Sequence, residues 1–271
     1  MSNKFLIELD EKKILPTIEG LTVINLCDFK NWYTGSSDYK YIFGIHKRDR
    51  FYSDIRDAAI DIRKDPSEIN FKTLIPVGSL QFIEGIKLEL TGKPLSVINI
   101  PLELNDKHFL HRNCRVLSLK AVKAFKEALD FESCRKTIIK PASNIKSFEC
   151  ATLDMIDLDK CSDTHVFISD WIDIEAEWRV FVYKGFIRGI RQYSGNDIKN
   201  QDKTSIKFIE ECISTYKDCP TAYTLDIGKT KDGHFVVIEV HNFVGCGLYG
   251  FEDTCLLDMY KAGWKYEISK A

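Results

Sequence analysis

A predicted β-hairpin in the C-terminal half of this chain constrains its fold more than any other feature. Two runs rich in β-branched and aromatic residues, 222–228 and 235–241, flank an Asp-Gly pair at 232–233. Asp-Gly between two such runs is a strong signal for a two-residue hairpin turn. In that register, Asp226 lies directly opposite Glu239. The sequence therefore predicts an antiparallel hairpin that carries two adjacent carboxylates.

The alternation along this hairpin predicts one packed face and one face that carries the acids. Apolar residues flank each acid, so the face behind the carboxylates is expected to pack in a core, whereas Phe235 and Val237 are expected on the acid face. Like charges directly opposite each other weaken a sheet unless a cation lies between them. Mg²⁺ in nucleotide-binding proteins takes carboxylate and phosphate oxygens. The alternatives are a solvated acid face, or a longer turn that shifts the register.

A second hairpin is predicted over 177–193, with a Lys-Gly turn at 184–185. In this register Glu177 and Arg179 share one face, and Arg191 falls on the other. Arg179 lies in a strand whose other residues are typical of burial, so its guanidinium needs an anion. That anion is either a phosphate, which suits the planar guanidinium, or a structural acid such as Glu177.

Lys140 ends an apolar strand predicted over 137–141 and directly precedes a proline. A lysine in this position can act as a point charge on a phosphate. Most lysines at the end of a strand are simply exposed, so the residue alone leaves both interpretations open.

The predicted secondary structure of the chain changes near residue 105, where the boundary between two lobes is expected. Before it, strands alternate with helices, as is typical of an α/β lobe, with strands predicted over 5–9, 21–26, 40–45, 73–79 and 97–101 and a helix over 52–64. After it, a helix is predicted over 119–130 with Ser118 as its N-cap, and then strands dominate, at 137–141, 165–169, 177–183, 186–193, 222–228 and 235–241, interrupted by a helix over 202–216.

Composition excludes several classes of function. A formal net charge of −2 gives no basis for binding nucleic acid or an acidic membrane in bulk. The chain has no apolar run of membrane-spanning length, and its N-terminus lacks the apolar core of a signal peptide. Its nine cysteines are odd in number and form no CxxC pair, which favours free thiols in a reducing compartment. We therefore expect a cytoplasmic protein.

Four segments resemble the ATP-grasp superfamily, and more narrowly its clade named for two arginines and one lysine. Their order and spacing carry the resemblance, which runs from about 74 to 252: IPVGSLQFI (75–83), IIKP (138–141), EWRVFV (177–182) and VVIEVHNFVGCGLYGFED (236–253). The resemblance implies an α+β, ATP-grasp fold. It implies an α/β N-terminal pre-ATP-grasp lobe (1–105) and a C-terminal antiparallel-sheet nucleotide-binding lobe (106–271) that contains the catalytic region.

The resemblance also implies ATP and Mg²⁺ as cofactors and assigns roles position by position. Lys140 resembles the lysine that contacts the α- and β-phosphates, and Glu177 resembles the acid that binds the ribose hydroxyls. The backbone of Asp170, Trp171 and Ile172 resembles the hinge that contacts the adenine edge. Arg179 and Arg191 resemble the arginines that hold the phosphates or the developing acyl phosphate. Asp226 and Glu239 resemble the two metal-bridging acids, in agreement with the hairpin argument.

The third metal ligand departs from the usual pattern. Many ATP-grasp enzymes have Glu, any residue, then Asn in this strand, whereas this chain has Glu239, Val240, His241 and then Asn242. Strand alternation predicts that His241 shares the face of Glu239, and a bulge would be needed to bring Asn242 inward. Because Mg²⁺ prefers oxygen, we expect Asn242 as the ligand, directly or through water, with His241 as the alternative.

The function that the resemblance implies is an ATP- and Mg²⁺-dependent carboxylate–amine ligase. Such an enzyme forms an amide or peptide bond through an acyl phosphate, with Lys140, Arg179 and Arg191 as catalytic residues. Its partners would be a carboxylate substrate and an amine acceptor, small molecule or peptide, and neither nucleic acid nor membrane. The alternatives are an ATP-binding assembly chaperone for a protein partner, without ligase activity, and a kinase-like enzyme. Neither the substrates nor the oligomeric state follows from the sequence.

Overall fold

The computed structural model describes residues 4–7, 74–77, 80–143, 147–195, 203–251 and 253–270. The contacts divide the chain into two compact units. Unit 1 comprises Met1–Pro94, Pro220–Ala222 and Phe243–Ala271, and unit 2 comprises Leu95–Cys219 and Tyr223–Asn242. The expected lobe boundary at residue 105 stays a prediction, and these contacts group 95–105 with unit 2 and 243–271 with unit 1.

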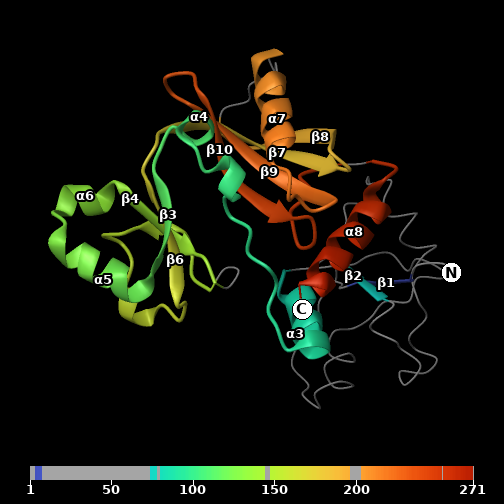
Figure 1. Ribbon diagram of the computed structural model, residues 1–271, viewed down its shortest axis with the longest axis horizontal. Helices are drawn as coiled ribbons and strands as arrows, with labels where there is room; N and C mark the ends of the chain where they lie inside the picture. The colour runs from blue at the N-terminus through green and yellow to red at the C-terminus, as the bar shows by residue number, and fades with distance from the viewer. Residues whose placement is uncertain are drawn as a thin grey trace. The chain divides into compact units, whose positions relative to one another are not determined.

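One sheet of unit 2 is built from the two predicted hairpins. Its strand order is β10 (Phe235–Asn242), β9 (Ala222–Thr230), β7 (Ile174–Tyr183) and β8 (Phe186–Gly195). Each hairpin is antiparallel, as predicted. The predicted helix forms as α7 (Lys203–Thr215), which lies against this sheet (Figure 1). Its Ile209 and Cys212 join a core with Trp178 and Val180 of β7 and Leu225 of β9, so the predicted apolar face is packed.

In the β9–β10 hairpin the two acids pair as predicted, but the turn differs from the predicted one and a bulge compensates for it. The backbone N–H of Thr230 donates to the carbonyl of His234 across a loop of three residues, 231–233, in which Gly233 has a φ of +92°. This loop shifts the register by one residue. A bulge between Val237 and Glu239 then shifts it back, so that Glu239 pairs with Asp226. The predicted two-residue turn is wrong, but the predicted pairing is confirmed.

The same bulge changes the face of the residues between it and the turn. Phe235 and Val237 pack with Leu225 and Ile227 in the core under the sheet. The prediction that Phe235 and Val237 lie on the acid face is therefore wrong. The physical reason is that one extra residue reverses the alternation of side chains along a strand.

The β7–β8 hairpin has the predicted turn but not the predicted register. Its turn residues, Lys184 and Gly185, both have a positive φ, of 53° and 78°, as a type I′ turn requires. An irregularity between Phe181 and Val182 then shifts the pairing, and Arg191 lies directly opposite Arg179. The prediction that the two arginines lie on opposite faces is wrong, again because a bulge reverses the alternation.

A second sheet of unit 2 has the order β3 (Cys114–Ser118), β6 (His165–Asp170), β4 (Thr137–Pro141) and β5 (Ala151–Thr152), with all pairs antiparallel. Helices α5 (Leu119–Ala128) and α6 (Phe131–Arg135) accompany it (Figure 1). Val122 of α5 and Cys134 of α6 pack with Ile139 of β4 and Val166 of β6. As predicted, Ser118 caps α5 by accepting a hydrogen bond from the N–H of Ala121.

Several short elements of unit 2 differ from the predictions. The sequence did not indicate β3, β5, α6 or the single turn α4 (Lys107–Leu110), because elements of two to five residues carry little periodicity. The strand predicted over 97–101 is wrong. Asn99 has a φ of +54° and makes only one bridge, to Val240 of β10. A left-handed residue interrupts an extended strand, and the 3₁₀ turn Leu102–Leu104 follows directly.

The described part of unit 1 contains two parallel strands and two helices. They are β1 (Lys4–Ile7), β2 (Leu74–Val77), α3 (Leu80–Thr91) and α8 (Leu256–Ser269). The strands predicted over 5–9 and 73–79 are confirmed within the described residues. Those over 21–26 and 40–45, and the helix over 52–64, lie outside them. Helix α8 was not predicted, although apolar residues at helical spacing could have indicated it.

A buried ion pair joins the two helices of unit 1. Lys87 of α3 donates to Glu267 of α8 at 2.5 Å, and the two side chains are 1% and 0% exposed. Gly245, in the loop before α8, has a φ of +74°, and a Cβ there would lie 2.8 Å from Leu80. The positive φ, which L side chains rarely adopt, is what favours glycine at this position of the segment 245–251.

The predictions on membranes and thiols concern the chain as a whole. In the described ranges, no helix combines the length and the apolar character that a bilayer crossing needs. The eight cysteines in these ranges have free thiols. The compartment stays a prediction.

Candidate functional site

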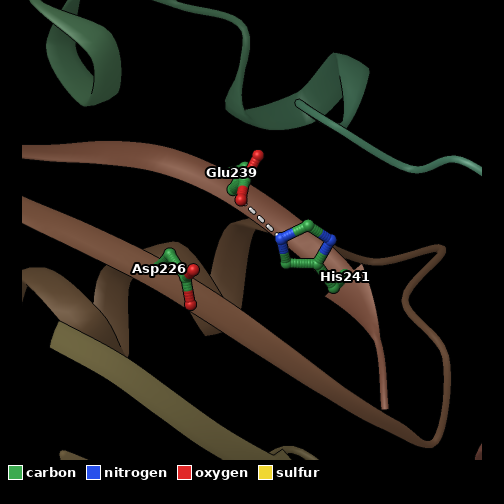
Figure 2. A group of neighbouring side chains, drawn as sticks. All are labelled: Asp226, Glu239 and His241. Atoms are coloured by element: carbon green, nitrogen blue, oxygen red, sulfur yellow. Dashed lines mark hydrogen bonds and ion pairs between the residues drawn. The ribbon is translucent and has the colours of Figure 1, made fainter. Parts of the chain in front are cut away.

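The two predicted metal acids meet a histidine on the face of the sheet opposite α7. Figure 2 shows Glu239 and His241 on one strand and Asp226 on the neighbouring strand. One ligand atom from each side chain can be chosen so that all three lie within 4.8 Å of one another. Among the described residues, this is the one group of His, Cys, Asp and Glu with such a spacing. Asp226 is buried, and the other two side chains are partly exposed.

Asp226 is held by Arg179 from the adjacent strand β7. The guanidinium donates from Nε to Oδ1 at 2.8 Å and from Nη2 to Oδ2 at 2.7 Å. The Tyr193 hydroxyl donates to the same Oδ2 at 3.4 Å. Burial, together with the carboxylates of Asp226 and Glu177, raises the pKa of Tyr193, so its phenol stays protonated. The acid that Arg179 contacts is thus Asp226, a bidentate partner that suits the planar guanidinium.

Glu239 is held by Lys140 and His241. Lys140 Nζ lies 2.8 Å from Oε2, and His241 Nε2 lies 2.5 Å from Oε1. Lys140 is only 13% exposed and lies 4.9 Å from the Phe167 ring centroid. The interpretation of Lys140 as a simple exposed lysine is therefore wrong. Burial raises the pKa of Glu239, but His241 and Lys140 outweigh it and hold that pKa well below its ordinary value.

The alternation of β4 explains why Lys140 reaches this site. Ile139 packs toward α5 and α6, so the next residue, Lys140, projects from the other face of its sheet. There it pairs with Phe167 of β6, which belongs to the core of the other sheet of unit 2. Lys140, on β4 of one sheet, thus contacts Glu239 on β10 of the other.

Arg112, which the sequence analysis missed, holds the bulge of β10. Its guanidinium donates to the carbonyl oxygens of Val237 at 2.9 Å and Ile238 at 3.3 Å. Burial lowers the pKa of Arg112, and Cys114, Asp170 and Glu239 oppose that shift. These carbonyls directly precede Glu239, so Arg112 supports the backbone that positions this acid. No motif in the sequence marks Arg112, because its role depends on a bulge far along the chain.

Asp170 is the last residue of β6, and Trp171 and Ile172 belong to the connection from β6 to β7, and therefore from one sheet of unit 2 to the other. The Asp170 carboxylate accepts hydrogen bonds from the backbone and side-chain amides of Asn113 at 3.0 and 2.6 Å. The backbone N–H of Asp170 donates to Asn113, and that of Trp171 donates to Lys136. The backbone donors of Asp170 and Trp171 are thus engaged, while their expected role toward adenine stays a prediction.

The remaining nucleotide-binding candidates lie on the second hairpin. Arg191 is opposite Arg179, and its Nη1 donates to the Ile190 carbonyl at 3.0 Å. Glu177 pairs with Ser194 in the register, and its carboxylate is one of the charges that raise the pKa of Tyr193. The Tyr193 hydroxyl, which donates its one proton to Asp226, thus lies near both carboxylates, an arrangement that no sequence motif indicated.

Asn242, the expected third metal ligand, lies on the other face of β10. The register runs without a bulge from Glu239 to Asn242 and pairs Asn242 with Tyr223, which is part of the core. Asn242 itself is 5% exposed. His241 instead shares the face of Glu239. The assignment of Asn242 stays a prediction, and the geometry favours His241.

The donor set fits a divalent cation. Two carboxylates from adjacent strands supply hard oxygen ligands, and the imidazole supplies a nitrogen at the same opening. Each acid also has a cationic partner, Arg179 or Lys140, that compensates its charge. The same two cations are placed to interact with an anionic ligand that approaches the acids.

A comparison with family models identifies residues 109–259, more than half of the chain, as an ATP-grasp domain. The matching model is family 2 of the clade named for two arginines and one lysine. No curated protein sequence matches the chain.

Three solved structures are among the matches. The chain is similar to the ATP-grasp ligase PsnB in complex with a minimal precursor, with 15% identity, 71% of this chain and 60% of that chain covered, and a TM-score of 0.37. It is similar to D-cycloserine synthetase DcsG, with 13% identity, 76% and 88% covered, and a TM-score of 0.42. It is similar to D-alanyl-alanine synthetase A from Vibrio cholerae, with 12% identity, 72% and 76% covered, and a TM-score of 0.42. The match thus spans less than two thirds of the PsnB chain.

Proposed function

Because this chain belongs to the ATP-grasp superfamily, in family 2 of the clade named for two arginines and one lysine, we propose that it is an ATP- and Mg²⁺-dependent carboxylate–amine ligase. It would form an amide bond by way of an acyl phosphate. The proposal covers the substrates as well: a carboxylate and an amine acceptor, small molecule or peptide.

One observation carries the proposal. The two acids that pair across β9 and β10 are each bound by a cation from another strand, Arg179 on Asp226 and Lys140 on Glu239. An ordinary structural site has no need of two facing carboxylates, because they repel each other. A site that receives a triphosphate with its metal needs both signs of charge at one place.

The protein's side chains would exchange partners when the nucleotide binds. A metal at Asp226 and Glu239 would supply positive charge beside the phosphate oxygens. Arg179 and Lys140 would then turn part of their hydrogen bonding from the acids to phosphate oxygens. Tyr193, whose raised pKa keeps its phenol protonated, would continue to donate to Asp226. Arg191, opposite Arg179, would contact the transferred phosphoryl group.

The rest of the nucleotide would extend along the β6–β7 connection. Glu177, which is partly exposed and lies near Tyr193, would accept hydrogen bonds from the ribose hydroxyls. The N–H groups of Asp170 and Trp171 are already donated to Asn113 and Lys136. The N–H of Ile172 would therefore be the backbone donor to the adenine edge.

The reaction balances without a covalent enzyme intermediate. A carboxylate oxygen attacks the γ-phosphorus, the bond from that phosphorus to the β,γ-bridging oxygen breaks, and ADP leaves. The amine nitrogen of the acceptor then attacks the carbonyl carbon of the acyl phosphate. Inorganic phosphate leaves with the bonding pair, and the nitrogen loses a proton to solvent. Arg179, Arg191 and Lys140 would stabilise the charge on the phosphoryl oxygens from fixed positions.

Isothermal titration with a non-hydrolysable ATP analogue, with and without Mg²⁺, tests the proposed site. We expect Mg²⁺-dependent binding to the native chain, and a loss of at least about tenfold in affinity in Asp226→Asn and Glu239→Gln. Asp218→Asn is the matched control, because Asp218 is exposed outside the site. Circular dichroism confirms that each variant is folded.

The outcomes separate the candidate functions. Equal affinity in all four proteins would refute the assignment of the acids. Tight binding of the analogue, followed in a separate assay with ATP by ADP release that requires both a carboxylate and an amine, supports the ligase. A phosphorylated product released without the amine would identify a kinase-like enzyme instead. Binding without any turnover, together with a stable protein partner in a pull-down, would favour the assembly chaperone.

A further inference from the structure

We propose that His241 is a direct ligand of the metal and shifts the preference of the site from Mg²⁺ toward divalent ions of the first transition series, of which Mn²⁺ shares the carboxylate ligands of Mg²⁺. The inference rests on the proposed function, since it concerns the metal at the same two acids. It goes beyond that function because it assigns a specificity-determining side chain that distinguishes this site from an all-oxygen one.

The His241 ring lies on the same face of the sheet as the two acids. His241 is two residues after Glu239 on a strand without a bulge in between, so both side chains project from one face. The ring nitrogen Nε2 lies 2.5 Å from Glu239 Oε1, whereas Lys140 binds the other carboxylate oxygen. Figure 2 shows this nitrogen directed toward Glu239, with Asp226 on the adjacent strand. The ring is 37% exposed, so a hydrated cation can reach it.

The competing oxygen ligand is on the wrong face. Asn242 pairs with Tyr223 and is 5% exposed, on the core side of β10. Bringing its amide to the acids would require a new bulge after Glu239, which would also move His241 away. With the register as it is, the third protein ligand available from the end of this strand is an imidazole nitrogen.

The chemistry of the ligands sets the selectivity. Mg²⁺ requires near-octahedral oxygen coordination and seldom takes nitrogen. Imidazole suits the later first-row ions best, and carboxylates suit Mn²⁺ as well as Mg²⁺. As a transition ion, Mn²⁺ tolerates a nitrogen ligand beside carboxylates better than Mg²⁺ does. Removing the imidazole from a site with two carboxylates should therefore change the affinity for Mg²⁺ little. The affinity for Mn²⁺ should fall, because Mn²⁺ loses a coordination bond. The ratio of the two affinities, and not either affinity alone, reports the role of His241.

The test uses the full chain with a non-hydrolysable ATP analogue and compares native protein with His241→Asn. Titrations with Mn²⁺ and Mg²⁺ give the ratio of dissociation constants, and pulsed electron paramagnetic resonance of the bound Mn²⁺ detects nitrogen coupling. His234→Gln is the matched control, because His234 is an exposed histidine at the turn of the same hairpin. We expect the preference for Mn²⁺ to fall by roughly tenfold in His241→Asn. The histidine nitrogen coupling should disappear in that variant and persist in His234→Gln.

Two results would overturn the inference. One leaves the proposed function standing, and the other overturns the proposed function as well. If Mn²⁺ and Mg²⁺ bind with the nucleotide in an unchanged ratio, and no histidine coupling appears in the native protein, His241 is not a ligand while the proposed function stands. If neither metal binds to any of the three proteins with the nucleotide present, the inference and the proposed function fail together. A folded His241→Asn, judged by its circular dichroism, is the condition for each comparison.

Discussion

Glu239 illustrates how a single carboxylate is kept charged in this site. Lys140 and His241 each bind one of its oxygens, so protonation of the acid would weaken both contacts. Burial favours the neutral form, but the two neighbours outweigh it and hold the pKa well below its ordinary value. A depressed pKa means that the ionised group stabilises the folded state above the unfolded pKa, and that this stabilisation is lost as the pH falls through the folded pKa.

This linkage predicts a pH-dependent difference between native protein and Glu239→Gln in the absence of metal and nucleotide. The native protein should unfold at a higher temperature near pH 7, and the difference should narrow below about pH 5, since an unfolded glutamate titrates near about 4.3. Thermal melts in a chelating buffer from pH 7 to the most acid pH at which both proteins stay folded measure it. Glu127→Gln, an exposed residue of α5, is the control. A difference in unfolding temperature that stays constant or widens as the pH falls below about 5 would contradict the direction of the pKa shift.

At the scale of elements, bulges decide which side chains share the site. The bulge in β10 restores the pairing of Glu239 with Asp226, and an irregularity in β7–β8 brings Arg191 opposite Arg179. A bulge leaves ladder groups unpaired. Arg112 satisfies two carbonyls at the β10 bulge, those of Val237 and Ile238. This contact stabilises the irregularity that orients the metal strand.

We therefore expect Arg112→Gln to destabilise the protein by about 1.5–3 kcal/mol, the range for hydrogen bonds from a charged group. Amide hydrogen exchange over 237–241 should accelerate more than exchange over β7, and the affinity for nucleotide with metal should fall. Arg115→Gln, on the exposed side of β3, should change neither the stability, nor the amide exchange over 237–241, nor the affinity for nucleotide. Unchanged exchange over 237–241 in Arg112→Gln would mean that the bulge is stable without this guanidinium.

For the whole molecule, the two units depend on different interactions. The expected site residues described above lie in unit 2, whereas the buried pair Lys87–Glu267 lies in unit 1. Removing one partner of a buried ion pair leaves an uncompensated charge, while replacing both partners is often neutral. Stability and ligand binding should therefore respond separately to changes in this pair.

Glu267→Gln should destabilise the chain by about 3–5 kcal/mol, and Lys87→Met combined with Glu267→Gln should recover most of that loss. The affinity of the folded protein for nucleotide with metal should stay within about twofold in both variants, since neither residue touches the acids. Urea unfolding and calorimetric titration measure the two quantities. Equal destabilisation in the single and double variants would show that charge compensation is not what the pair contributes.

The sequence by itself determined those features that depend on neighbouring residues. Hydrophobic alternation located β4, β6, β7, β8, β9 and β10, turn chemistry located both hairpins, and the serine before α5 indicated its start. The pairing of Asp226 with Glu239 was also predicted, although two irregularities that cancel each other produce it. These signals are local, because propensity, side-chain period and turn geometry act over a few residues.

Only the tertiary structure decided which of these residues meet and on which face. Lys140 and Glu239 are 99 positions apart in the chain, and their contact depends on how the two sheets of unit 2 pack. The faces of Phe235, Val237 and Arg191 depend on bulges, which form where other parts of the assembled protein satisfy the unpaired backbone groups and bury the side chains. A bulge of one residue reverses every face beyond it, so strand period alone could not predict the composition of the site.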